Sequence, residues 1–217
     1  MPQQIAPMAH YYIYLHGFAS SPQSAKALDL ARRFQSIERS LLIPDLNQDD
    51  FTHLTLTRQI QQVQALFPPA PQPVTLIGSS LGGLTAAWLA QQQHQVQRIV
   101  LLAPAFGFLN HWLDRLGTAT VQQWQTSQML MVYHYGAKQT LPLHYRFVED
   151  AMQYDESQLQ RSIPTLILHG CHDEVIPLQA SRDYARNRGE IRLIELDSDH
   201  ALTDVMPQIW QEILAIL

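Results

Sequence analysis

One serine in this chain stands where its hydroxyl could act as a nucleophile. Residues 78–82 read Gly-Ser-Ser-Leu-Gly, which places Ser80 at the centre of the pattern G-x-S-x-G. The pattern follows the apolar run 74–77 and opens a segment of helical character, as a strand-to-helix nucleophile turn requires. The flanking glycines allow close backbone approach, and the helix N-terminus places free N–H groups beside a developing oxyanion. The alternative is a glycine-rich turn with a capping serine. Ser79 occupies an x position and is assigned no chemical role.

A serine hydroxyl is a weak nucleophile until a base accepts its proton. On such a turn the acid and the base follow the serine in that chain order, each after a later strand. Of the ten histidines, only His200 lies beyond the last predicted strand, in the polar loop 197–202. Asp173 and Glu174 both follow the preceding strand, and either carboxylate could fix the imidazole tautomer and stabilise its cation.

The loop before these carboxylates also permits a metal-binding interpretation. His169, Cys171, His172 and Asp173 are all common ligand types. No second cluster at a familiar spacing occurs elsewhere, which favours a site without metal, and we expect neither a metal nor an organic cofactor. Cys171 is the only cysteine. Nothing marks its thiol as activated, and one cysteine cannot form an intramolecular disulfide.

Acyl transfer also needs two N–H donors that converge on the carbonyl oxygen of the substrate, and loss of one costs about 3 kcal/mol. The backbone N–H of Leu81, directly after the nucleophile, is the first candidate. The second is the N–H of Phe18, because the first predicted strand ends in His16-Gly17 and the glycine permits a turn that directs this N–H inward. The alternative for residues 16–18 is a plain turn.

These residues need a scaffold, and the chain alternates short apolar runs with longer mixed segments, which is typical of βα units. The apolar runs predict helices on both faces of the sheet. We therefore predict one α/β domain over residues 1–217, a three-layer αβα sandwich with about six mainly parallel strands. The predicted strands are 11–15, 41–44, 74–78, 99–103, 166–169 and 191–196, and the predicted helices are 24–34, 52–67, 81–92, 178–187 and 205–216.

The segment 105–162 interrupts this alternation and is predicted to be an insertion that covers the strand ends as a lid. Residues 106–125 suit one or two helices, residues 129–145 suit a hairpin around Gly136, and residues 147–154 suit another helix. Its aromatic side chains either line an apolar pocket above Ser80 or merely pack the insertion onto the sheet. The pocket candidates are Phe106, Trp112, Tyr133 and Tyr145.

The composition of the chain limits the classes of molecule that the protein is expected to bind. Charged residues make up 15% of the chain, the formal net charge is −5, and no run of Lys or Arg suggests a nucleic-acid or membrane surface. No apolar run approaches the roughly 20 residues that span a bilayer, and residues 1–10 lack the features of a secretory signal. We therefore expect a cytoplasmic protein with a small-molecule substrate, and composition leaves the oligomeric state open.

The motifs together resemble the α/β-hydrolase superfamily and, more narrowly, the small bacterial YqiA/YcfP-like esterases. Residues 14–27 read Y-L-H-G-F-x-S-S-P-x-S-x-K-A, and G-S-S-L-G-G, H-G-x-x-D-E-V-I-P and D-H follow in order. The resemblance implies a minimal α/β-hydrolase fold and a triad of Ser80, Asp173 and His200, with Asp173 preferred over Glu174. It implies hydrolysis of small carboxylic esters or thioesters through an acyl-enzyme.

Two other functions stay open because the fold and the triad do not define the reaction. The same residues could support acyl transfer or C–C bond hydrolysis. A hydrolase-like fold could also serve as a non-catalytic ligand-binding module.

Overall fold

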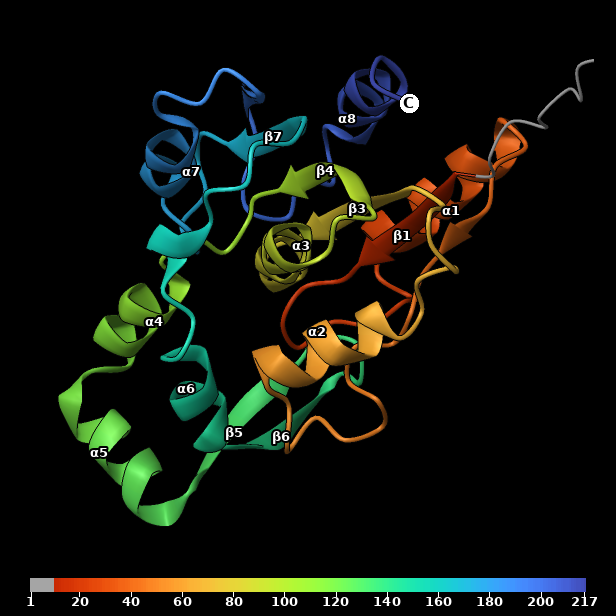
Figure 1. The fold of residues 1–217 in the computed structure, drawn as a ribbon. Coiled ribbons are helices and arrows are strands. Elements are labelled where there is room, and N and C mark those ends of the chain that lie inside the picture. The colour runs from red at the N-terminus through yellow and green to blue at the C-terminus, as the bar shows by residue number, and fades with distance from the viewer. Residues whose placement is uncertain (1–9) are drawn as a thin grey trace, which may run out of the picture.

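The computed structural model describes residues 10–217, which form a parallel sheet with helices on both faces (Figure 1). Residues 1–9, which hold most of the segment in which we expect no secretory signal, lie outside the described residues. The sheet has the order β2-β1-β3-β4-β7-β8, and every pairing in it is parallel. Its strands are β1 (Tyr11–Leu15), β2 (Leu41–Leu42), β3 (Val74–Ser79), β4 (Val96–Leu102), β7 (Thr165–Gly170) and β8 (Ile191–Leu196).

Helices cover the sheet on both sides because alternate strand residues point to opposite faces. In β1, Ile13 and Leu15 belong to the core beneath α2 (Leu56–Gln64) and α3 (Leu81–Gln92), and α7 (Leu178–Ala185) packs on the same core. Tyr12 and Tyr14 belong to a second core beneath α1 (Ala25–Ser36) and α8 (Met206–Leu214). The predicted three-layer αβα arrangement is confirmed.

Between β4 and β7 the chain leaves the sheet and forms four helical segments and a hairpin, most of which lie in the lower left of Figure 1. Trp124 anchors this region, since its side chain is buried and its indole N–H donates to the Leu143 carbonyl at 3.0 Å. The elements are α4 (Phe108–Leu116), α5 (Thr118–Ser127), the antiparallel strands β5 (Met129–His134) and β6 (Gln139–His144), α6 (Arg146–Ala151) and the 3₁₀ turn η1 (Glu156–Gln158).

Several boundaries differ from the sequence prediction for local physical reasons. Strand β2 ends at Leu42 because it is an edge strand that pairs only with β1, and Pro44 further along has no N–H to contribute. Helix α2 begins at Leu56 instead of Thr52, since the Thr55 hydroxyl caps it by accepting from the Arg58 N–H at 3.1 Å. Strand β4 begins three residues before the predicted Ile99, at Val96.

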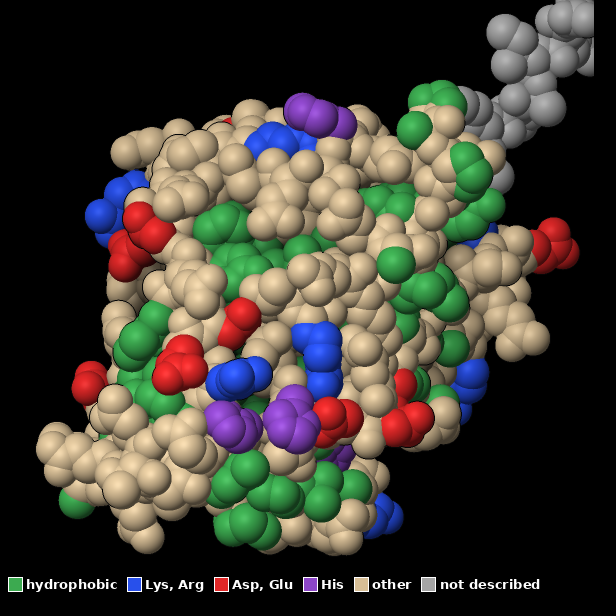
Figure 2. Space-filling model, turned by 60° about the horizontal axis from the view of Figure 1, so that its bottom comes forward, with side chains coloured by type: hydrophobic (Ala, Val, Ile, Leu, Met, Phe, Trp, Pro, Cys, Tyr) green, Lys and Arg blue, Asp and Glu red, His purple; other side chains and the backbone are tan. Residues whose placement is uncertain are grey.

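The surface carries both signs of charge. On the face shown in Figure 2, acidic and basic side chains are interspersed, as the absence of a cationic run in the sequence predicts. None of the helices between residues 10 and 217 is both long enough and apolar enough to cross a membrane.

Candidate active site

Ser80 lies on the turn between β3 and α3 in a strained backbone conformation. Its φ of 53° and ψ of −119° fall where residues other than glycine are rarely found. Hydrogen bonds hold it there: its N–H donates to the Leu102 carbonyl at 2.9 Å, and its carbonyl accepts from the Gly83 and Ala105 N–H groups. The turn therefore presents the Ser80 hydroxyl at the carboxyl edge of the sheet, as the G-x-S-x-G pattern predicts.

The two glycines of the pattern are required by close backbone contact. A Cβ added to Gly82 would lie 2.6 Å from the His16 carbonyl oxygen, and one added to Gly78 would lie 2.7 Å from the Gly83 Cα. Real Cβ atoms essentially never approach so closely. Helix α3 thus begins against the end of β1, and this packing sets the height of Ser80 above the sheet.

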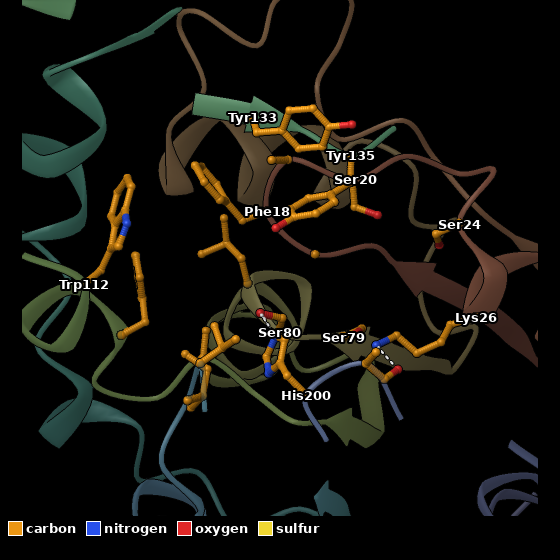
Figure 3. A pocket seen from close by; sticks show the side chains of 18 of the residues that line it. Phe18, Ser20, Ser24, Lys26, Ser79, Ser80, Trp112, Tyr133, Tyr135 and His200 are labelled. Carbon is orange, nitrogen blue, oxygen red and sulfur yellow. Dashed lines mark hydrogen bonds between the residues drawn. The ribbon is translucent and has the colours of Figure 1, made fainter. Parts of the chain in front are cut away.

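His200 and Asp173 reach Ser80 from two other strand ends. His200 follows β8, and its Nε2 lies 3.1 Å from the Ser80 Oγ (Figure 3). Its Nδ1 lies 2.7 Å from the Asp173 Oδ2 in the loop after β7. Glu174 is exposed, and its side chain makes no hydrogen bond within residues 10–217. Of the two candidate carboxylates, Asp173 is the one that contacts the imidazole.

Asp173 is held in one orientation by several donors. Its Oδ1 accepts from the Val175 and Ile176 N–H groups, both at 2.8 Å. The buried His169 places its Nε2 3.1 Å from the Asp173 Oδ2, a contact that the sequence did not indicate. Burial by itself would raise the pKa of Asp173, but the hydrogen bonds from His169 and His200 hold it well below its usual value. The carboxylate therefore stays ionised and can stabilise an imidazolium.

Both candidate oxyanion donors have free N–H groups in the part of the chain that is described, residues 10–217. Neither the Phe18 N–H nor the Leu81 N–H has a hydrogen-bond partner there. The loop that carries Phe18 lies against the serine, since a Cβ added to Gly17 would be 3.3 Å from the Ser80 Cβ. Two unpartnered N–H groups beside the Ser80 hydroxyl match the donors that an oxyanion needs.

Ser80 and His200 open onto a cavity of about 840 Å³, within the range of small-molecule sites. Two of the four predicted pocket residues, Trp112 and Tyr133, line it. Phe106 instead stacks on Tyr184 at 4.1 Å between ring centroids, behind the cavity wall. The fourth, Tyr145, packs edge-on against Trp124 inside the insertion. Other aromatic residues of the insertion line the cavity as well, namely Phe108, Tyr135 and Phe147, and nothing in the sequence indicated the further lining residues Ala105, Arg115, Leu116 and Val132.

The sequence analysis also missed a polar group of lining residues. Lys26 reaches the cavity from α1, where its Nζ donates to the Ala201 carbonyl at 2.8 Å (Figure 3). The only signal in the sequence was its place in the motif 14–27, which carries the resemblance but assigns this lysine no role. Ser79, which was given no role, also lines the cavity. In the described part of the chain, residues 10–217, no three His, Cys, Asp or Glu side chains converge as metal ligands would.

Residues 11–217 match the family described as Uncharacterised protein family (UPF0227). The chain belongs to this family. Because the match spans nearly the whole chain, it includes the Ser80 turn and the loops of Asp173 and His200. No curated protein sequence matches the UPF0227 chain.

Solved structures resemble this UPF0227 protein in fold. The mouse alpha/beta hydrolase domain-containing protein 10 is 19% identical with a TM-score of 0.71, and the match covers 95% of this chain and 90% of the mouse protein. Est1E from Butyrivibrio proteoclasticus with bound ferulic acid is 18% identical with a TM-score of 0.76, and the match covers 99% of this chain and 93% of Est1E. A pyrethroid hydrolase from Sphingobium faniae JZ-2 is 18% identical with a TM-score of 0.65, and the match covers 95% of this chain and 96% of the hydrolase. The chain therefore has the α/β-hydrolase fold.

Proposed function

We propose that this protein is a serine hydrolase that cleaves small carboxylic esters or thioesters. The observation that carries the proposal is the unbroken hydrogen-bond chain from Ser80 through His200 to Asp173, which opens onto a cavity of about 840 Å³. A nucleophile, a base within hydrogen-bond reach and a carboxylate that orients the base are the parts that acyl transfer needs.

In the proposed mechanism Ser80 attacks the acyl carbon while His200 Nε2 takes its proton. The Phe18 and Leu81 N–H groups hold the oxyanion, and Asp173 stabilises the imidazolium that forms at His200. The imidazolium then donates its proton to the leaving oxygen or sulfur, and the acyl-enzyme forms. A water molecule, deprotonated by His200, releases the acid and restores Ser80.

The segment 105–162 is proposed to act as a lid that selects the acyl group. Side chains from α4, from β5 and from α6 line the cavity, among them Trp112, Tyr133 and Phe147. An apolar cover of this kind excludes water from the reacting carbonyl and limits the length of the chain that fits. The ferulic acid bound by Est1E and the pyrethroid hydrolase activity of the Sphingobium faniae protein are further reasons to consider ester substrates.

The first test is hydrolysis of a series of p-nitrophenyl esters from acetate to laurate. Ser80→Ala should abolish turnover, and the matched control Ser157→Ala, at an exposed site on η1, should keep it. The acyl length with the highest kcat/KM measures the apolar part of the cavity. Equal rates in the wild-type protein and Ser80→Ala would contradict the proposed nucleophile.

A second test does not depend on the choice of ester. A fluorophosphonate should label Ser80 covalently, because the His200 contact activates its hydroxyl, and mass spectrometry of the Ser80 peptide should show the adduct. Labelling without ester turnover would direct attention to acyl transfer or C–C bond hydrolysis, which use the same triad. Absence of both labelling and turnover would leave the ligand-binding module as the better interpretation.

A further inference from the structure

The cavity beside Ser80 has two chemically different ends. Side chains from α4 and α6, including Trp112 and Phe147, make one end mostly apolar; the exception is Arg115, whose guanidinium donates to the Glu174 carbonyl at 2.8 Å. Figure 3 shows Trp112 and Lys26 on opposite sides of Ser80 and His200. The Lys26 end lies between the first turn of α1 and the end of β3. Its polar lining includes Tyr14, Ser20, Ser24, Lys26 and Ser79, and Asp199 and Thr203 from the loop around His200 line the same cavity.

Lys26 brings an ammonium group into this end without a paired carboxylate. Its Nζ donates one hydrogen bond, to the Ala201 carbonyl at 2.8 Å, and an ammonium has three N–H groups, so two remain for a ligand. Across residues 10–217 it forms no ion pair. A charge kept in a partly buried site without a counter-ion disfavours folding, which makes a role in binding the better explanation.

Two aspartates act on Lys26 through their charge, and both accept hydrogen bonds from other groups, although the exposed Asp199 also lines the cavity. Asp173 bonds to His200 and to two backbone N–H groups, and the Asp199 Oδ1 accepts from the Ala201 and Leu202 N–H groups. Burial lowers the pKa of Lys26 to about 8, and the two aspartates oppose this shift from a distance. At neutral pH the ammonium is therefore mostly charged and available to an anion.

Hydroxyl groups around Lys26 can donate to the same ligand. The Ser24 Oγ accepts from the Ala27 N–H as the cap of α1, and the Ser24 hydroxyl also hydrogen-bonds with Tyr14. Tyr14 is fully buried and hydrogen-bonds with Ser24 and Ser79, and burial raises its pKa, so the phenol stays neutral. Because a phenol has one hydrogen to donate, at least one of the two serine hydroxyls accepts from it and keeps its own hydrogen for a ligand. An ammonium among hydroxyl donors matches a carboxylate, which accepts through two oxygens.

We propose that the Lys26 end of the cavity is a subsite for a carboxylate carried by the substrate. The inference rests on the proposed hydrolase function and narrows it: the preferred esters or thioesters are anionic on the side that lies along α1 and apolar on the side beneath the insertion. The carboxylate accepts from Lys26 Nζ and from whichever hydroxyl of Ser24 and Ser79 does not donate to Tyr14. Lys26 is then a specificity residue, which binds the substrate and takes no part in proton transfer.

The experiment compares two pairs of esters that differ in a single carboxylate. Mono-p-nitrophenyl glutarate against p-nitrophenyl pentanoate places the charge on the acyl part. A carboxy-p-nitrophenyl acetate against p-nitrophenyl acetate places it on the leaving group. For one of the pairs we expect the wild-type protein to favour the anionic ester in kcat/KM. Lys26→Met keeps the length of the side chain and should reduce this preference by about 10- to 100-fold, the usual effect of one charge-assisted hydrogen bond.

Lys138→Met is the matched control, because Lys138 is the only other lysine and lies exposed in the β5–β6 turn. It should leave the preference unchanged. If neutral esters are hydrolysed but neither pair shows a preference that depends on Lys26, the subsite is refuted and the hydrolase function stands. An equal loss of kcat/KM for the anionic and the neutral ester of each pair in Lys26→Met would also refute the subsite, since Lys26 would then only support the Ala201 loop.

A binding measurement tests the subsite without turnover. With two lysines in the chain, ¹³C-labelled lysine gives two assignable Cε signals whose pH titration reports each pKa. In Ser80→Ala, glutarate should raise the pKa of Lys26 and leave Lys138 unaffected, and the uncharged glutaramide should change neither. A Lys26 pKa that glutarate does not move would refute the subsite. A raised pKa in a protein that hydrolyses no ester would refute the hydrolase function and keep the anion site.

Discussion

Replacement of Gly170 by alanine should separate the proposed catalytic residues Ser80 and His200 without changing either of them. Gly170 ends β7, and its backbone packs against the loop that leads into His200. A Cβ added there would lie 2.5 Å from the Asp199 carbonyl oxygen, whereas ordinary contact begins at 3.4 Å, so the loop must retreat by about 0.9 Å. The His200–Ser80 separation, 3.1 Å in the structure, would then reach about 4 Å, beyond hydrogen-bond range.

A displacement of about 1 Å in a reacting group can cost on the order of 100-fold in rate. We expect Gly170→Ala to lower kcat on the best p-nitrophenyl ester by about that factor and to change KM much less, because residues 199–203 are the only part of the cavity lining that the substitution displaces. The rate of fluorophosphonate labelling at Ser80 should fall in parallel. Overpacking should also cost about 1–3 kcal/mol of the free energy of unfolding, so the assay is run well below the measured Tm.

The control is Gly189→Ala, since a Cβ at Gly189 would meet nothing within 4 Å. It should keep wild-type kinetics. A folded Gly170→Ala protein with wild-type kcat would refute the reasoning, because the contact between Gly170 and Asp199 would then not set the position of His200.

Three further predictions follow from individual contacts. Asp173→Asn should lower kcat by about 10⁴-fold, since the amide cannot hold the correct His200 tautomer, and steady-state kinetics checks this. The pKa of Asp173 is lower in the folded protein than in the unfolded chain, where it is about 4, so its ionised form stabilises the fold at pH values above about 4 and this contribution is lost as the pH falls further. In urea titrations between pH 5 and 3, the free energy of unfolding should therefore fall more steeply for the wild-type protein than for Asp173→Asn. Trp124→Phe removes the indole N–H that donates to the Leu143 carbonyl and should reduce the free energy of unfolding by about 0.5–1.5 kcal/mol in urea titrations, with Ser80 labelling unchanged.

Much of the scaffold could be predicted because its determinants are local in the chain. Apolar runs of strand length, followed by helical segments, placed β1, β3, β7 and β8 within about a residue. The turn at Ser80 could be predicted for the same reason, since glycine spacing and the strand-to-helix change lie within a few neighbouring residues. The hairpin of the insertion followed from Gly136 between two apolar runs.

Only the tertiary structure shows which of several chemically similar candidate residues reach the site. Asp173 and Glu174 are neighbours with the same functional group, and the direction of each side chain after β7 decides which one meets His200. The aromatic residues of the insertion pose the same problem. Phe106 and Tyr145 pack away from the cavity whereas Trp112 and Tyr133 line it, and sequence spacing carries no information on this difference.

The sequence by itself determined the layered α/β fold and the order in which serine, carboxylate and imidazole follow three strands. The tertiary structure decided what surrounds them. Lys26 bonds to Ala201 across 175 residues of sequence, and His169 meets Asp173 only because their loop folds back on itself. Periodicity and turn chemistry act over a few residues, whereas a subsite forms where distant segments pack together, and that packing depends on the whole chain.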